Sequence, residues 1–147
     1  MRTTGRALPG AAETLAALAA TPTVHQTVLT GNLRDVARIK LEVFGLDHHL
    51  DLEAGAYGDD DQDRSKLVAI ARQRTADRTG VLFRTHDTVL IGDTPNDVSA
   101  GLGAGIRVIG VASGKSGADE LRSAGAHEVA ASMAECREIL VQWAELR

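Results

Sequence analysis

The sequence predicts one α/β domain with a parallel sheet and helices on both faces. Short apolar runs alternate with helical periodicity along all 147 residues, which is the pattern of a parallel sheet with crossover helices. Apolar residues make up 44% and charged residues 24% of the chain, an ordinary globular composition. The runs Val24–Thr30 and Asp87–Asp93 each carry a polar side chain to the tip of a predicted strand, which is where open α/β sheets bind ligands.

Each element has its own local signal. Pro9 and Gly10 open the first helix, Gly45 ends the second, and Gly58 closes the second strand. Ile139 and Trp143 lie at helical spacing near the end of the chain. In order, the pattern predicts a helix to about Ala20, a strand Val24–Thr30, a helix Leu33–Phe44, a strand Leu50–Tyr57, a helix Asp63–Thr75, a strand Asp87–Asp93, a helix Asp97–Ala104, a strand Arg107–Ala112, a helix Ala118–Ala124, an edge strand His127–Ala130 and a helix Ser132–Leu146.

Composition also limits the partners and the location. The net charge is −4, which favours neither nucleic acid nor an anionic membrane as a partner. A single cysteine, Cys136, excludes an internal disulfide and fits a reducing compartment. The sequence contains no apolar stretch long enough to span a bilayer, and the N-terminus lacks the apolar core of a signal peptide. We therefore expect a cytoplasmic location.

Gly92-Asp93-Thr94-Pro95-Asn96-Asp97 is the most informative motif. It follows an apolar strand and opens an Ala/Gly-rich helix, so Asp93 lies at the strand tip and Asp97 one helical turn later. Mg²⁺ commonly takes one or two carboxylates together with water and phosphate oxygens, and these two residues are the candidate metal ligands. The structural alternative is that the aspartates only cap the helix.

Two other motifs are candidates for binding phosphate. In Leu29-Thr30-Gly31-Asn32, a hydroxyl at a strand tip precedes free backbone N–H groups at a helix start, an arrangement that suits an anion; the alternative is a simple strand-end cap. In Gly58–Lys66, either Arg64 or Lys66 could reach a phosphate, or both could lie on a solvated helix face.

Taken together and in this order, the motifs resemble the core domain of the haloacid dehalogenase-like (HAD) phosphohydrolases, most closely the phosphoglycolate-phosphatase-like members. The lead-in Leu8-Pro9-Gly10 and the tail Val108–Gly114 fit the same pattern, so the resemblance covers nearly the whole chain. It implies a three-layer Rossmannoid core and Mg²⁺-dependent hydrolysis of small phosphate monoesters through an aspartyl-phosphate.

The resemblance also implies roles for the individual residues. Thr30, with Gly31 and Asn32, would hold the phosphoryl group, and Asp93 and Asp97 would hold Mg²⁺. The family's basic residue corresponds to Arg64 or Lys66. We favour Arg64, because its fork of donors suits phosphate oxygens and it lies at the expected start of the helix.

The chain departs from the family at its beginning. Family members start with an apolar strand that ends in Asp-x-Asp-x-Thr, whose first Asp is the nucleophile, and a helical cap domain follows. No Asp precedes Thr30 here, and no cap is expected. We expect a truncated single domain over residues 1–147 that binds Mg²⁺ weakly and has little or no activity alone. It would be a deletion, a misassigned gene start, a fragment or half of a split protein. The alternative is a non-catalytic binding or assembly module.

The missing strand is central in the family, between the strands that end at Thr30 and Asp93. Without it, two apolar strand edges, Val24–Leu29 and Thr88–Ile91, face a gap. Unpaired strand edges are costly and prone to pairing. We therefore expect the sheet to close up, to borrow a strand from another chain, or to form a symmetric homodimer, and we favour self-association.

Overall fold

The computed structural model describes residues 11–20, 24–112 and 116–145. The predicted alternation of strands and helices is present over most of this part. The elements are α1 (Ala11–Ala19), α2 (Arg34–Val43), the 3-10 turns η1 (Asp47–His49), η2 (Leu52–Ala54) and η3 (Thr85–Asp87), α3 (Arg64–Thr79), β1 (Val89–Gly92), α4 (Pro95–Gly103), β2 (Arg107–Val111), α5 (Ala118–Ser123), β3 (Glu128–Ala130) and α6 (Met133–Glu145).

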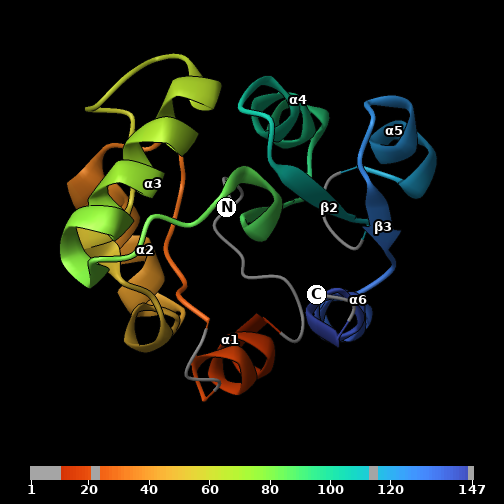
Figure 1. Ribbon diagram of the computed structural model, residues 1–147, viewed down its shortest axis with the longest axis horizontal. Coiled ribbons are helices and arrows are strands. Elements are labelled where there is room, and N and C mark those ends of the chain that lie inside the picture. Colours follow the sequence, from red (N-terminus) through yellow and green to blue (C-terminus); the bar gives the residue numbers. More distant parts are fainter. Residues whose placement is uncertain (1–10, 21–23, 113–115, 146–147) are drawn as a thin grey trace.

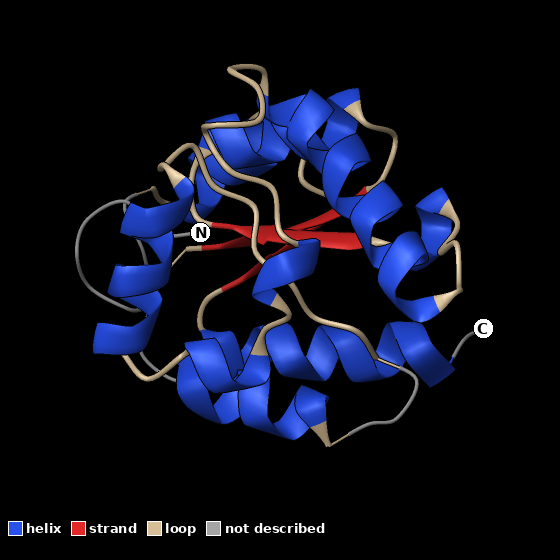
Figure 2. Cartoon of the chain, turned by 90° about the vertical axis from the view of Figure 1, so that its left-hand side faces the viewer, coloured by secondary structure: helices blue, strands red, loops and turns tan. Residues whose placement is uncertain are grey.

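The sheet is parallel and has the strand order β1-β2-β3 in the described part of the chain. Val89 is opposite Arg107 and Gly92 is opposite Gly110, while Val111 is opposite Ala130. Helices cover both faces, as Figure 2 shows edge-on, with the strands in the middle layer. The predicted fold class, an α/β domain with three layers, is confirmed.

The two faces of β2 supply two separate parts of the core. Ile109 and Val111 point to the side of α6, where they join Met133 and Cys136. Val108 points to the other side and packs with residues of α4 and α5, namely Val98 and Leu121. All of these side chains except Met133 are less than 2% exposed. In Figure 1, α1 and α6 therefore lie on one side of the sheet and α4 and α5 on the other.

Cys136 belongs to this core and is fully buried. Burial raises the pKa of its thiol from the ordinary value of 9.0 to about 12. The thiolate is the reactive form of cysteine, so Cys136 is a packing residue.

Two predicted strands, Val24–Thr30 and Leu50–Tyr57, are wrong. Residues 24–30 are extended, but they form only one parallel bridge, between Leu29 and Ala56. The chain before Ala56 turns into η2 instead, where the Ala54 amide donates to the Asp51 carbonyl. A strand is defined by its ladder of hydrogen bonds, and one bridge between two short segments does not extend into a ladder.

Residues 24–29 and β1 are not paired with each other in the described part of the chain. Among the described residues, β1 pairs with β2 on one edge and with no strand on the other. Residues 24–29 and β1 therefore do not meet, and no described strand lies between them. The other predicted elements differ from the observed ones by a few residues at their ends, except that α3 continues to Thr79. In the described part of the chain, no helix has the length and apolarity needed to cross a membrane.

Candidate functional site

Helix α4, which carries the motif Gly92–Asp97, begins at the carboxyl end of β1 and is capped by its own sequence. Thr94 is the N-cap, and its hydroxyl accepts a hydrogen bond from the Asp97 amide at 3.3 Å. Pro95 occupies the first turn, where its missing N–H costs no helical hydrogen bond. Asp97 reaches back with Oδ2, which accepts from the Thr94 hydroxyl at 3.0 Å and from the Asp93 amide at 3.2 Å. The cap fixes both aspartates at the strand tip.

Gly92 makes the room that Asp97 needs. A Cβ atom at position 92 would lie 2.3 Å from the Asp97 Cβ, closer than van der Waals contact allows. The carboxylates of Asp93 and Asp97 are both buried, with residue exposures of 5% and 2%. Burying a charge is expensive unless it is paired, so each needs a partner nearby.

Arg64 is the partner of Asp97. Its Nη1 donates to Asp97 Oδ1 at 2.8 Å, and the pair is mostly shielded, with side-chain exposures of 28% and 3%. Arg64 is the first residue of α3 because Asp63 caps this helix, accepting from the Ser65 amide at 3.0 Å. Lys66, two residues later, is exposed. The motifs Gly58–Lys66 and Gly92–Asp97 are therefore joined through Arg64.

The motif Leu29–Asn32 lies against the guanidinium of Arg64. A Cβ atom at Gly31 would be 3.5 Å from Arg64 Nη2. Thr30 is 3% exposed, and its Oγ1 accepts from the Asn32 amide at 3.1 Å. The loop is also supported from the other side, since the Gly58 amide donates to the Asn32 carbonyl at 2.8 Å. Contacts thus run continuously from the loop after Thr30, through Arg64, to Asp97 and Asp93.

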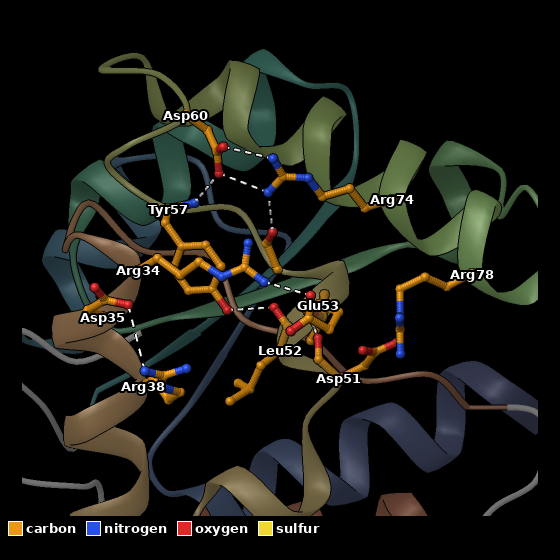
Figure 3. A network of polar contacts seen from close by, with 12 residues as sticks. Arg34, Asp35, Arg38, Asp51, Leu52, Glu53, Tyr57, Asp60, Arg74 and Arg78 are labelled. Carbon is orange, nitrogen blue, oxygen red and sulfur yellow. Dashed lines mark hydrogen bonds and ion pairs between the residues drawn. The ribbon is translucent and has the colours of Figure 1, made fainter.

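A polar network beside this site holds the loop that leads to Arg64 (Figure 3). Arg74 on α3 donates to both oxygens of Asp60, at 2.7 and 2.9 Å, and to the Gly55 carbonyl at 2.7 Å. The same carboxylate accepts from the Tyr57 amide at 2.9 Å. The hydrogen bonds from Arg74 lower the pKa of Asp60 below its ordinary value of 3.8.

The network extends to α2 through Arg34. Its guanidinium pairs with Glu53 at 2.7 Å and lies over the Tyr57 ring, and its backbone amide donates to Asp59 at 2.6 Å. The Tyr57 hydroxyl donates to the Leu52 carbonyl at 2.7 Å, and burial raises its pKa above 10.0. Sequence reasoning did not identify this network or the support from Thr94. Only the Thr-x-x-Asp spacing, a variant of the capping box, signals Thr94 in the sequence.

Asp93 and Asp97 are the candidate donors for Mg²⁺. Two carboxylates lie within one helical turn, which is the number that Mg²⁺ commonly takes from a protein. However, both oxygens of Asp97 already accept hydrogen bonds. In the described residues no group of three or more His, Cys, Asp or Glu side chains could hold a metal. Any ion here would depend mainly on Asp93 and on ligands from outside these residues.

A match to a known protein family identifies the family of the segment that carries Arg64, Asp93 and Asp97. Residues 64–136 match the family model described as HAD-hydrolase-like. Residues 64–136 belong to the HAD-like hydrolase family. This match contains Arg64, Asp93 and Asp97, so the predicted resemblance is confirmed. No match was found among the curated proteins.

Solved structures show the same fold over nearly the whole chain. A HAD family hydrolase from Deinococcus radiodurans R1, with bound phosphate and sodium, is 29% identical, covers 93% of this chain and 60% of its own, and has a TM-score of 0.74. A predicted phosphatase from Clostridium acetobutylicum is 23% identical, with coverages of 91% and 59% and a TM-score of 0.75. A predicted phosphoglycolate phosphatase from Haemophilus somnus 129pt is 21% identical, with coverages of 92% and 57% and a TM-score of 0.73. The chain spans about three fifths of the length of each of these structures.

Proposed function

We propose that these 147 residues form the phosphate- and metal-binding part of a Mg²⁺-dependent phosphohydrolase that acts on small phosphate monoesters. The observation that carries the proposal is the 2.8 Å ion pair between Arg64 and Asp97, with Gly31 against the same guanidinium. It brings all three family motifs to one edge of the sheet. Phosphoryl transfer depends mostly on positioning and on charge stabilisation, and these residues can supply both.

Thr30 is suited to donate to a phosphoryl oxygen. Its Oγ1 accepts from the Asn32 amide, which leaves the hydroxyl proton free for an acceptor outside the loop. Because the Asn32 N–H donates this hydrogen bond within the loop, it is not available to a phosphate. We therefore assign phosphate binding to the Thr30 hydroxyl and the Gly31 amide, with Asn32 as the residue that orients the hydroxyl.

We assign the neutralising cation to Arg64 rather than Lys66. Arg64 uses Nη1 for Asp97, and a guanidinium has further donors on Nη2 and Nε. Those two atoms are also the ones that lie nearest to Gly31. Lys66 is exposed. Asp93 and Asp97 would hold Mg²⁺, which supplies charge neutralisation at the phosphoryl oxygens when it is bound.

The nucleophile is not among these residues. The covalent route needs a carboxylate on the neighbouring strand, and the first Asp in the sequence is Asp35, after the Thr30 motif. We therefore expect the 147-residue chain to bind phosphate without turning over a phosphate ester. A second candidate is a non-catalytic binding module, for which the cavity of about 360 Å³ lined by residues 24–29 and 87–93 is the supporting observation.

Calorimetry with inorganic phosphate in Mg²⁺ buffer tests the proposal. We expect Arg64→Gln to weaken phosphate binding about tenfold, because a hydrogen bond from a charged donor contributes about 1.5 kcal/mol or more. Lys66→Gln is the matched comparison and should change the affinity less than about twofold, as expected for an exposed charge. Undetectable phosphate binding by the wild type would overturn the proposal. A loss with Lys66→Gln but not with Arg64→Gln would move the role to Lys66.

A further inference from the structure

The loop that precedes α2 and the loop that precedes α3 lie directly against each other. The Thr30 amide donates to the Ala56 carbonyl at 3.1 Å, and the Gly58 amide donates to the Asn32 carbonyl at 2.8 Å. A Cβ atom at Gly58 would collide with the carbonyl oxygen of Gly31. The two loops therefore approach so closely that position 58 has no room for a side chain.

Helix α2 begins in the first of these loops, and its own sequence does not cap it. Leu33 occupies the N-cap position and makes no side-chain hydrogen bond there. An apolar side chain has no acceptor for the free N–H groups of the first helical turn. The helices α3 and α4 differ in this respect, because Asp63 and Thr94 cap them from within their own segments.

Asp59, on the second loop, supplies the acceptor that α2 lacks. Its Oδ1 accepts from the amide of Arg34, the first residue of α2, at 2.6 Å. The side chain of Arg34 is held as well, since its guanidinium pairs with Glu53 at 2.7 Å and lies 5.6 Å from the centre of the Tyr57 ring (Figure 3). A carboxylate is also favoured at this end of a helix by the helix dipole. The start of α2 is thus fixed to the neighbouring loop.

We propose that Asp59 is a positioning residue for the phosphate site. Only three residues separate Thr30 from Arg34, so the cap on Arg34 holds the Thr30 hydroxyl and the Gly31 amide in place beside Arg64. A loop that is ordered before its ligand arrives binds that ligand at a lower entropic cost. The inference rests on the proposed function, which assigns these two groups to the phosphate.

Two substitutions separate the hydrogen bond of Asp59 from its charge. Asp59→Ala removes both, and we expect calorimetry in Mg²⁺ buffer to show inorganic phosphate binding weakened about fivefold, the usual effect of losing a cap. Asp59→Asn removes only the charge, and Asn caps a helix as well as Asp does. The Asn protein should therefore bind phosphate within about twofold of the wild type.

Ser132→Ala is the matched control, because it removes a cap from a helix outside the site. The Ser132 hydroxyl accepts from the Glu135 amide at 3.2 Å at the start of α6. We expect this variant and Asp59→Ala to lose similar stability in urea melts, while Ser132→Ala keeps the phosphate affinity of the wild type. The comparison shows whether weaker binding comes from the position of the loop or from lower stability alone.

Amide hydrogen exchange followed by NMR tests the position of the loop without any phosphate. The Gly58 amide is the reporter, since it bonds to the Asn32 carbonyl and does not contact Asp59 through this bond. We expect it to exchange about fivefold faster in Asp59→Ala, as for a cap loss that opens the loop. Its exchange in Asp59→Asn and in Ser132→Ala should match the wild type.

The outcomes distinguish this proposal from the proposed function. Faster exchange at Gly58 in Asp59→Ala, with no phosphate binding by the wild type, would confirm that Asp59 positions the loop and would overturn the proposed function. Equal weakening by Ala and Asn would show an effect of charge and overturn the role of Asp59. Normal or tighter phosphate binding by Asp59→Ala, or unchanged exchange at Gly58, would overturn it too.

Discussion

At the scale of single residues, the site depends on close approach between backbone and carboxylate. Gly92 leaves no space for a side chain beside Asp97, and Asp97 in turn orients Arg64 and the Asp93 amide. A side chain at position 92 would therefore displace Asp97 and, through its hydrogen bonds, Arg64 and the Asp93 amide.

Gly92→Ala should lower the free energy of unfolding by about 2 kcal/mol, a typical cost of overpacking. It should also weaken phosphate binding, because Asp97 would have to move away from Arg64. Gly117→Ala is the matched control. Gly117 has an ordinary φ of −80°, and a Cβ atom added there would meet no other atom within 4 Å, so the stability should change by less than about 0.5 kcal/mol.

Denaturant melts of the two variants would measure this difference. Equal stability of the Gly92→Ala protein and the wild type, with normal phosphate affinity, would show that the contact between Gly92 and Asp97 does not hold the site together.

The sequence favours Arg64 over Lys66 as the residue that faces the site, but it does not fix the choice, for a physical reason. The two residues are about 200° apart around a helix, so only one can point to a given neighbour, and the choice depends on where the helix begins. The Asp63 cap sets the start at Arg64. Asp93 and Asp97 could be placed from the sequence because the end of the apolar strand and the start of the following helix lie within six residues.

At the scale of elements, the loop between η2 and α3 is held by ion pairs. Asp60 accepts from Arg74 and from the Tyr57 amide, and Arg74 also binds the Gly55 carbonyl. These bonds fix the loop on the side of α3, close to the helix start that carries Arg64. The loop is part of the support for the site although it contains none of the proposed ligands.

Asp60→Asn should destabilise the chain by about 1–2 kcal/mol at neutral pH, since it weakens hydrogen bonds to a charged group. The hydrogen bonds from Arg74 depress the pKa of Asp60 below 3.8 in the folded chain. The stability that the Asp60 carboxylate contributes is therefore complete above its pKa in the unfolded chain, 3.8. This stability is lost as the pH falls from 3.8 toward the lower pKa of the folded chain. The difference between wild type and variant should shrink below about pH 4.

Urea melts between pH 3 and pH 7 would check this prediction. Asp35→Asn is the control, because Asp35 is 85% exposed and its ion pair with Arg38 is 3.7 Å long; such pairs contribute at most about 1 kcal/mol. A stability difference for Asp60→Asn that stays constant down to pH 3 would contradict the role of its carboxylate.

The helices and β1–β3 were predictable because their signals are local, such as Gly45 at φ 69° after α2. The segment Val24–Thr30 was not. Its apolar residues predict a strand. A strand forms only where a neighbouring segment pairs with it over several residues, and residues far away in the sequence determine whether such a segment lies there. The structure pairs it at one bridge only, between Leu29 and Ala56.

At the scale of the whole molecule, the second edge of β1 bears on how the chain behaves in solution. In the described part of the chain, β1 pairs with a strand on one edge only, and Val89, Leu90 and Ile91 are partly buried. An apolar strand edge of this kind favours association with another strand, which a second copy of the chain can supply. We therefore expect a concentration-dependent homodimer.

Light scattering at micromolar concentration would test this expectation. The average molar mass should rise with protein concentration from that of a monomer toward that of a dimer. A strictly monomeric chain that melts cooperatively would show that the strand edges are satisfied within one molecule.

The central claim is that these residues bind phosphate and metal but require a carboxylate on a neighbouring strand for turnover. Hydrolysis of p-nitrophenyl phosphate in Mg²⁺ buffer tests it most directly. The chain alone should stay at background. A longer chain with a strand that ends in Asp-x-Asp-x-Thr joined ahead of these residues should show Mg²⁺-dependent turnover, and replacing the first Asp of that motif by Asn should abolish the turnover. Robust hydrolysis by the 147-residue chain alone, lost in Asp93→Asn, would contradict the account and place a nucleophile within these residues.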